Sequence, residues 1–366
     1  MTRTTGQPFR PVSRPPSRRS GGFSLIEMLT VLVILAIVLS ILLPALAATR
    51  NSARKAATQS LQKTIGDACQ QFAIDQRRQP GYFNQTDMGS AANRDTYGFT
   101  QMQNLVLDLA GGVLDRTTED VGNRIIDVGP TPQARAIVAI DEIGSPSLSS
   151  RGNVSKAYFR PDPKYFVAQT GPNQLVVNDV NDQLFPMIVD SWGQPMLAWV
   201  QDEVPTGSEL FSAEVATSGA GAIRAKFYWA TNAGVLKASG TGRSGSNQNA
   251  ESLLGGGFTG PNTIAGLTVP ARAASLTGLL GNPSGGIATG GPPIGAKMPL
   301  VARGSVIIQS AGPNEIFLGA NERGGKVAAS DNGTAPTGPS NFLWFKPNLD
   351  PIAGGAFDDV VTAYGN

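Results

Sequence analysis

Histidine is missing from this 366-residue chain, and cysteine occurs only once, at Cys69. Histidine is the side chain that most often moves protons near neutral pH, so its absence argues against an enzyme and excludes a Ser-His-Asp triad. With one cysteine and no histidine, the chain has no ligand set for zinc and no disulfide of its own. The stretch "LLGGGFTG" lacks the Gly-Lys-Ser/Thr ending of a phosphate-binding loop. We therefore expect no enzymatic activity.

Charged residues are also scarce, at 15% of the chain, and the formal net charge is only +2. The first 22 residues contain no acid and five arginines, which are Arg3, Arg10, Arg14, Arg18 and Arg19. This leaves 24 of the 29 basic residues and all 27 acidic ones for residues 23–366, without a stripe of lysine or arginine. Such a body lacks the electrostatic footprint of a protein that binds nucleic acid.

A long apolar segment follows the arginines. Residues 23–48 are apolar except for Ser24, Glu27, Thr30 and Ser40, and as a helix they would be about 39 Å long. This length spans a hydrocarbon core of about 30 Å. The arginines in front of it predict a cytoplasmic N-terminus, with the chain after about residue 50 on the other side of the membrane.

The small residues stand in front of this segment. A secretory signal carries them after the apolar stretch, at the cleavage site, whereas Gly21 and Gly22 come first here. The resulting "GGFSLIEM" strongly resembles the prepilin signal of type IV pilins and of the pseudopilins of type II secretion systems. In that family a membrane peptidase cuts after the glycine and methylates the new amine. The resemblance implies a cut between Gly22 and Phe23, which makes Glu27 the fifth residue of the mature chain.

The resemblance also implies a location, partners and a function. A pilin-like subunit is a single-pass protein of the inner (cytoplasmic) membrane whose C-terminal domain is periplasmic. Its partners are the prepilin peptidase, other pilin or pseudopilin subunits and the membrane, with no nucleic acid. It acts as a structural subunit that assembles through its N-terminal helix into a filament of a type II secretion or type IV pilus-type machine.

Glu27 is costly inside a membrane-spanning helix. A carboxylate there costs on the order of 3 kcal/mol on insertion scales, so it is expected to face a partner rather than lipid. Cleavage would create one, because the freed ammonium of Phe23 in one subunit can lie beside Glu27 of its neighbour in a helical stack. The alternative is an interfacial glutamate that reaches the lipid headgroups, four residues past Phe23.

The helix is expected to continue past the membrane. Five residues repeat at spacings of four and three and form one helical face: Ala57, Leu61, Ile65, Ala68 and Phe72. This predicts one helix over residues 23–75, whose second half packs on a soluble domain, with Cys69 as a small buried residue close to that face. Pro44 removes a backbone hydrogen bond, so a kink or local melting is expected there. Pilins commonly carry a proline at a similar depth.

The remaining sequence predicts an α+β domain. After a loop over residues 79–99, "TQMQNLVLDLAGG" predicts a short helix that ends at Gly111 and Gly112. "ARAIVAIDEIG" fits a helix slightly better than a strand. From Tyr165 onward, short β-prone runs between turn formers predict antiparallel strands: "YFVAQ", "QLVVN", "FPMIVD", "PMLAWVQ", "RAKFYWAT" and "GSVIIQSAG".

Two stretches look like parts of major pseudopilins. "DSWGQP", residues 190–195, is similar to the Asp-x-Trp-Gly-x-Pro turn of their sheet, and Trp192 is available to cap the core. "IIQSAGPNEIFLG" and the later "FDDVVTAYGN" are similar to their calcium loop. This resemblance implies calcium ligands at Asn314, Asp358, Asp359 and the Ala311 carbonyl. Asn314 brings no charge and about 43 residues separate the two halves, so the alternative is that Asp358 and Asp359 are solvated acids near a chain end.

The organisation expected from these patterns has four parts. They are a leader over residues 1–22, a transmembrane or filament-core helix over 23–48, its amphipathic continuation over 49–75, and an extracytoplasmic α+β domain over 76–366. A Gly/Ser/Ala/Pro-rich insertion lies between about residues 231 and 299 and buries little apolar surface.

Two other functions compete with the assembly subunit. One is a binding module that the pilin-type signal displays, with glycans or other ligands stacked on tryptophan rings. The candidate residues are Trp192, Trp199, Trp229 and Trp344. Isolated tryptophans, however, are more often part of a hydrophobic core. The other is a tethered hydrolase that uses acid pairs such as Asp141-Glu142 or Asp202-Glu203. No surrounding motif supports those pairs.

Overall fold

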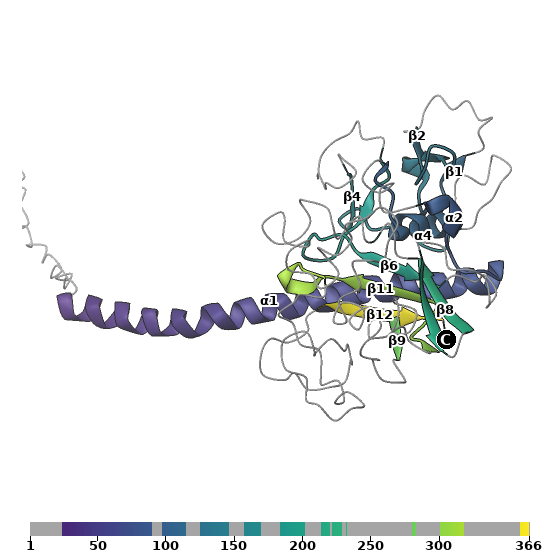
Figure 1. Ribbon diagram of the computed structural model, residues 1–366. Coiled ribbons are helices and arrows are strands. Elements are labelled where there is room, and N and C mark those ends of the chain that lie inside the picture. The colour runs from purple at the N-terminus through teal and green to yellow at the C-terminus, as the bar shows by residue number, and fades with distance from the viewer. Residues whose placement is uncertain are drawn as a thin grey trace, which may run out of the picture. The chain divides into compact units, whose positions relative to one another are not determined.

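The computed structural model describes residues 24–89, 97–114, 125–145, 157–169, 184–201, 214–219, 222–228, 232, 280–282, 301–317 and 359–365. The chain divides into two compact units, Met1–Asn51 and Ser52–Asn366. Their elements are labelled in Figure 1. A long N-terminal helix followed by antiparallel sheets confirms the expected α+β class.

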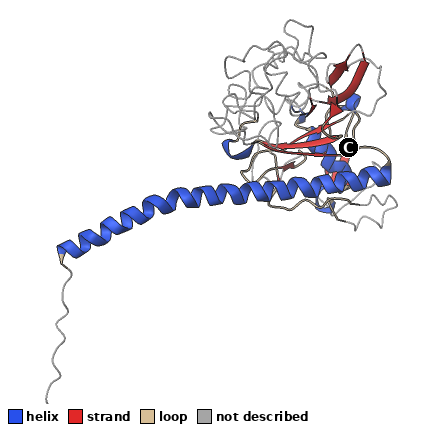
Figure 2. Cartoon of the chain, turned by 90° about the horizontal axis from the view of Figure 1, so that it is seen from below, coloured by secondary structure: helices blue, strands red, loops and turns tan. Residues whose placement is uncertain are grey.

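The long helix α1 spans Leu25–Gln76, which confirms the prediction of one helix over residues 23–75. It is unbroken in Figure 2, and Pro44 lies inside it, so of the two expected outcomes, a kink or local melting, the local melting is wrong. Proline removes one backbone hydrogen bond, and the leucine and alanine residues around it have high helix propensity. Pro44 therefore does not end the helix.

The second half of α1 buries one face. The buried residues recur every three to four positions, and we call them the docking face: Thr58, Leu61, Gln62, Ile65, Gly66, Ala68, Cys69 and Phe72. Four of the five stripe residues expected from the sequence are among them, and Ala57 is half-buried. Cys69 is buried as predicted, and burial raises the pKa of its thiol.

The docking face covers a three-stranded antiparallel sheet made of β6 (Leu197–Val200), β11 (Val306–Ser310) and β12 (Val360–Tyr364). β11 is the central strand, so Val306 pairs with Val200 on one side and with Tyr364 on the other. Figure 1 shows β11 and β12 running alongside α1. The C-terminal strand thus joins the sheet next to the helix that begins the globular unit.

α4 (Gln101–Ala110) packs against β6 and is buried on nearly all sides. A capping box of Thr100 and Gln103 begins it, and Gly111 ends it with a φ of 70°. The expected short helix is therefore confirmed. Beyond it, β1 (Val113–Leu114), β3 (Ala136–Ala139) and β2 (Ile125–Val128) form a second antiparallel sheet in that order.

The preference for a helix in "ARAIVAIDEIG" is wrong. Residues 136–139 form β3 and pair with β1 on one side and β2 on the other, and only the 3-10 turn η1 (Ile140–Glu142) follows. These four residues are small or β-branched, and so short a run fits the periodicity of a helix as well as that of a strand. Pairing with strands on both sides stabilises the β structure.

The remaining described strands form three antiparallel pairs. β4 (Phe166–Val167) pairs with β5 (Met187–Ile188), β7 (Glu214–Gly219) with β8 (Ala222–Tyr228), and β9 (Gly281–Asn282) with β10 (Val301–Ala302), all antiparallel as expected. The expected loop over residues 79–99 contains the short helix α2 (Gln85–Met88). The predicted strand "QLVVN" and most of the glycine-rich insertion lie outside the described residues.

Candidate functional site

Glu27 caps the N-terminus of its own helix. Ser24 precedes the first turn, its carbonyl accepts from the Met28 amide at 3.1 Å, and its amide donates to Glu27 Oε2 at 2.8 Å. A glutamate three residues after a serine cap is the spacing of a capping box. The sequence analysis missed this role, although "SLIE" carries the signal. Gly22 and Phe23, the residues at the expected cut, lie outside the described residues.

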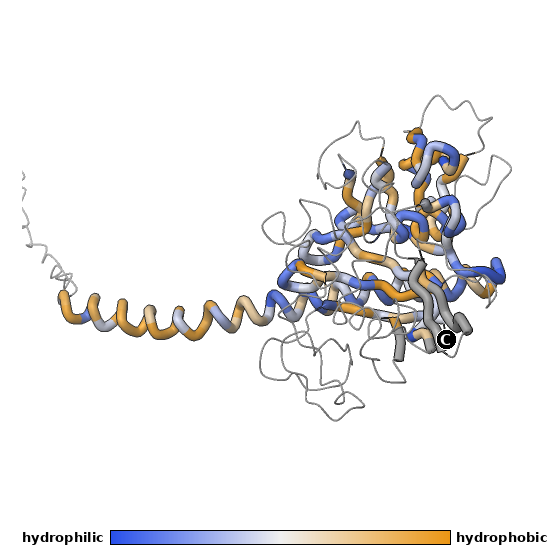
Figure 3. Tube along the Cα trace, viewed as in Figure 1, coloured by the Kyte–Doolittle hydropathy of each residue, from blue (hydrophilic) through white to orange (hydrophobic). Residues whose placement is uncertain are grey.

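The first half of α1 exposes apolar side chains in every direction. All side chains of residues 24–53 are exposed, and Figure 3 shows the N-terminal half of the helix mostly in the orange of hydrophobic residues. By length and composition α1 can cross a membrane, and the most apolar window of the helix has no buried residue. A helix that is apolar all round requires lipid or other helices as its surroundings.

Two buried positions attach α1 to the sheet. Gln62 Nε2 donates to the carbonyl of Val360 at 2.7 Å and to that of Ile308 at 3.5 Å, and Gln62 Oε1 accepts from Thr362 Oγ1 at 2.7 Å. One turn later, Gly66 lies against the ring of Tyr364, where a Cβ atom would overlap the ring. The helix is thus joined to both β11 and β12.

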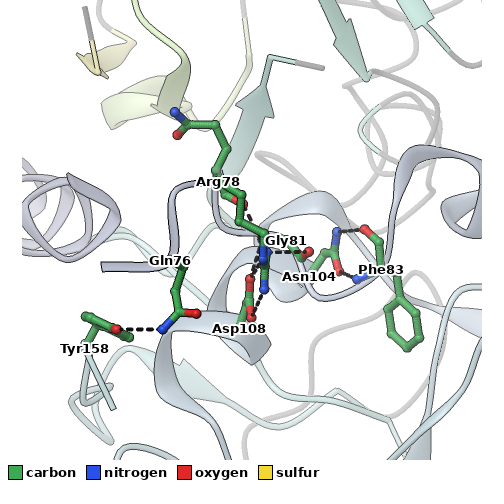
Figure 4. A network of polar contacts seen from close by, with 8 residues as sticks. Gln76, Arg78, Gly81, Phe83, Asn104, Asp108 and Tyr158 are labelled. Carbon is green, nitrogen blue, oxygen red and sulfur yellow. Dashed lines mark hydrogen bonds and ion pairs between the residues drawn. The ribbon is translucent and has the colours of Figure 1, made fainter. Parts of the chain in front are cut away.

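A polar network fixes the chain after α1 (Figure 4). Arg78 forms two hydrogen bonds to Asp108 of α4, at 2.6 and 2.9 Å, and Asp108 also accepts from the Gly81 amide at 2.9 Å. The Arg78 guanidinium lies 4.7 Å from the centre of the Phe72 ring. Gln76 adds a hydrogen bond to the Tyr158 hydroxyl at 3.1 Å. Bidentate geometry of this kind restrains the direction in which the chain leaves the helix.

One family model matches the chain, and it describes the prokaryotic N-terminal methylation motif, at residues 17–43. The chain carries the signal of the type IV pilin family. The matched residues include the two glycines, Phe23, Glu27 and most of the apolar half of α1. Comparisons with curated proteins and with solved structures found no match.

This pilin-type signal supports a precursor that is processed by a prepilin peptidase and a structural subunit rather than an enzyme. The apolar helix in turn supports anchoring in a membrane.

The turn "DSWGQP" is held by the buried carboxylate of Asp190. Asp190 Oδ1 accepts from the amides of Trp192 at 2.8 Å and Gln194 at 2.9 Å, and Oδ2 accepts from Ser310 Oγ at 2.6 Å. Gly193 completes the turn with a φ of 90°, which favours glycine. Burial raises the pKa of Asp190 from 3.8 to about 6, and the hydrogen bond from Ser310 opposes this shift. The turn is thereby fixed to the end of β11.

Asp190 is expected to make the globular unit more stable in mild acid. A carboxyl group whose pKa is raised by folding stabilises the fold when protonated, so this contribution is complete below about pH 4 and is lost as the pH rises through about 6. The shift from 3.8 to about 6 corresponds to about 3 kcal/mol at most. In Asp190→Asn, urea unfolding should depend much less on pH between 4.5 and 7.5. Asp67→Asn, at an exposed position, is the control, and an unchanged pH profile in Asp190→Asn would contradict the assignment.

The structure brings together two of the expected calcium ligands. Ala311 follows β11 and Asp359 precedes β12, and the antiparallel register places them next to the Ser310–Val360 pair. Asp359 Oδ2 accepts from Gln309 Nε2 at 2.6 Å, and Asn314 Oδ1 accepts from the Ile316 amide at 2.7 Å in the turn η6 (Gly312–Asn314). Asp358 lies outside the described residues.

These donors are fewer than a calcium ion requires. Calcium takes six to eight oxygen ligands, whereas this set has one carboxylate, one amide oxygen and the Ala311 carbonyl. Among the described residues, no group of three or more His, Cys, Asp or Glu side chains could hold a metal ion. The described part of the loop therefore does not form a calcium site by itself.

The described residues give little support to the two competing functions, a ligand-binding module and a tethered hydrolase. Trp199 is buried and donates from Nε1 to Gln309 Oε1 at 3.0 Å, so its ring is not available for stacking on a ligand. Trp192 is half-buried. Asp141 and Glu142 lie in η1, and the remaining candidates lie outside the described residues: Trp229, Trp344, Asp202 and Glu203.

Proposed function

We propose that the protein is a pilin-like or pseudopilin subunit that assembles through α1 into a filament of a type II secretion or type IV pilus-type machine. The observation that carries this proposal is the exposed apolar half of α1, which contains a single carboxylate, Glu27, four residues after Phe23 in a matching methylation motif. Lipid can cover this surface before assembly, and the helices of other subunits can cover it afterwards.

The proposal includes a topology. The five arginines before Phe23 hold the leader in the cytoplasm by the positive-inside rule. The apolar helix then crosses the inner membrane once, and the unit that follows lies on the periplasmic side. In this arrangement the first half of α1 enters the filament core, and the docking face in the second half stays packed on the protein's own sheet. The burial of that face supports this division.

Cleavage between Gly22 and Phe23 is the first test of the function. The protein extracted from membranes is expected to begin at a methylated Phe23, as read by N-terminal sequencing and intact mass. The same protein from cells that lack a prepilin peptidase serves as the control and should keep its leader. An intact Met1 in the peptidase-containing cells, or a new terminus beyond Ala45, would contradict the pilin-type function and favour an ordinary anchor or secretory signal.

Calcium binding stays a prediction that depends on Asp358 and on other donors outside the described residues. If these complete the set of Asn314, Asp359 and the Ala311 carbonyl, calcium at one hundred times its dissociation constant should stabilise the fold by about 2.7 kcal/mol. The measurement is the thermal midpoint with calcium and with chelator, in the wild type and in a double Asp358→Ala, Asp359→Ala variant. Equal midpoints for the wild type under both conditions would remove the site.

A further inference from the structure

The part of α1 between the apolar segment and the docking face is basic. No acidic residue occurs between Glu27 and Asp67, whereas four basic ones do: Arg50, Arg54, Lys55 and Lys63. Arg54 follows Ala48 by six residues of the same helix, or about 9 Å of helix length. When residues 23–48 occupy the hydrocarbon core, Arg54 and Lys55 therefore lie at the depth of the lipid headgroups.

One contact with α1 places two aromatic residues near the helical turn that follows this basic turn. The Ser191 amide donates to Thr58 Oγ1 at 3.2 Å, and Thr58 lies one helical turn after Arg54 on the same face. This contact brings the neighbouring Trp192 to the beginning of the docking face, and the Tyr165 hydroxyl lies 3.5 Å from Ser191 Oγ. Lys55 is exposed and the other three side chains are half-buried. We call this group the collar: Arg54, Lys55, Tyr165 and Trp192.

We propose that the collar binds the anionic phospholipid surface of the membrane that α1 spans, so that the globular unit rests on the headgroups before the subunit enters a filament. Tyrosine and tryptophan favour the headgroup level because they combine an apolar ring with a polar end. Lysine and arginine are attracted to anionic lipids, and their long side chains reach the phosphates. The inference rests on the proposed function, since it requires α1 to be embedded in the membrane.

The other polar groups near the collar are consistent with this partner. The indole N–H of Trp192 is buried and has no hydrogen-bond acceptor in the described part of the chain, so a bond to a lipid phosphate or carbonyl would require the ring to turn outward. Asp162, the acid closest in sequence to Tyr165, pairs with Lys164 at 3.1 Å. Lys55 is exposed, so its ammonium is accessible to lipid phosphates.

Tryptophan quenching by brominated lipids tests the proposal. The full-length protein is reconstituted into vesicles of brominated phosphatidylcholine with or without brominated phosphatidylglycerol, and Trp192→Phe isolates the signal of Trp192. We expect strong quenching of Trp192 only in the vesicles that contain phosphatidylglycerol. The double variant Arg54→Gln, Lys55→Gln should lose most of this quenching. Lys63→Gln, at an exposed position further along α1, should keep it.

Three results would overturn the proposal. Absence of Trp192 quenching in a protein that resists carbonate extraction would mean that the helix is embedded but the collar does not touch lipid. Crosslinks between copies at Trp192 in that case would assign the surface to a second subunit. Equal quenching in the two kinds of vesicle would exclude recognition of anionic headgroups. Extraction of the protein by carbonate would mean that α1 is not embedded in the membrane. That result would contradict both the proposed function and lipid binding by the collar.

Discussion

Glu27→Val is expected to leave the protein in the membrane and to abolish crosslinking between neighbouring subunits. Valine removes the cost of placing a carboxylate in an apolar segment, so insertion becomes easier. In the proposed filament it also removes the partner of the ammonium that cleavage would create at Phe23, so that this charge would be left uncompensated in the filament core. The measurement is crosslinking between engineered cysteines in α1, together with carbonate extraction. Cys69 is buried with a raised pKa and does not compete for the reagent.

Glu27→Gln separates the two roles of this side chain. Glutamine can still accept a hydrogen bond from the Ser24 amide, as Glu27 Oε2 does at 2.8 Å, but it carries no charge. If the charge is what assembly requires, Glu27→Gln should fail as Glu27→Val does. Full crosslinking in Glu27→Gln would assign the residue to capping alone, and full crosslinking in Glu27→Val would remove any role in assembly.

Gly66→Ala is expected to destabilise the globular unit by about 3 kcal/mol, the upper part of the range for overpacking a core. In an exposed helix the same change would stabilise by about 1 kcal/mol, because alanine is the better helix former. Here the added methyl group would overlap the ring of Tyr364, which lies directly on Gly66. Urea unfolding of the full-length protein in detergent measures the difference.

The partner residue provides the control for this prediction. In a Tyr364→Leu background the overlap is relieved, so Gly66→Ala should cost little or become mildly stabilising, and the two changes should be strongly non-additive. Ser60→Ala, on the exposed side of α1, should have little effect in either background. Additive effects of Gly66→Ala and Tyr364→Leu would mean that the close contact does not limit this position.

The N-terminal helix was largely predictable because its signals are local. The order of arginines, glycines, Phe23, Glu27 and apolar residues is read along the chain, and the matching methylation motif confirmed its meaning. The stripe from Leu61 to Phe72 predicted the buried face of α1, since helical periodicity follows from backbone geometry alone. The cap that Glu27 forms with the Ser24 amide is also a local feature, because a serine three residues before a glutamate is the spacing of a capping box.

The structure of the globular unit depended on contacts between distant residues. Residues 136–139 form a strand because two other strands pair with them, although their composition allows a helix. Gln62 contacts β12 across 298 residues of sequence, and Asp190 contacts Ser310 across 120. No spacing in the sequence reveals such pairs, because each needs the register of a sheet that forms only on folding. The sequence by itself thus determined the long apolar helix and its methylation motif. Tertiary structure decided which polar residues are buried against the helix, because a buried amide or carboxylate is tolerated only where folding supplies its hydrogen-bond partners.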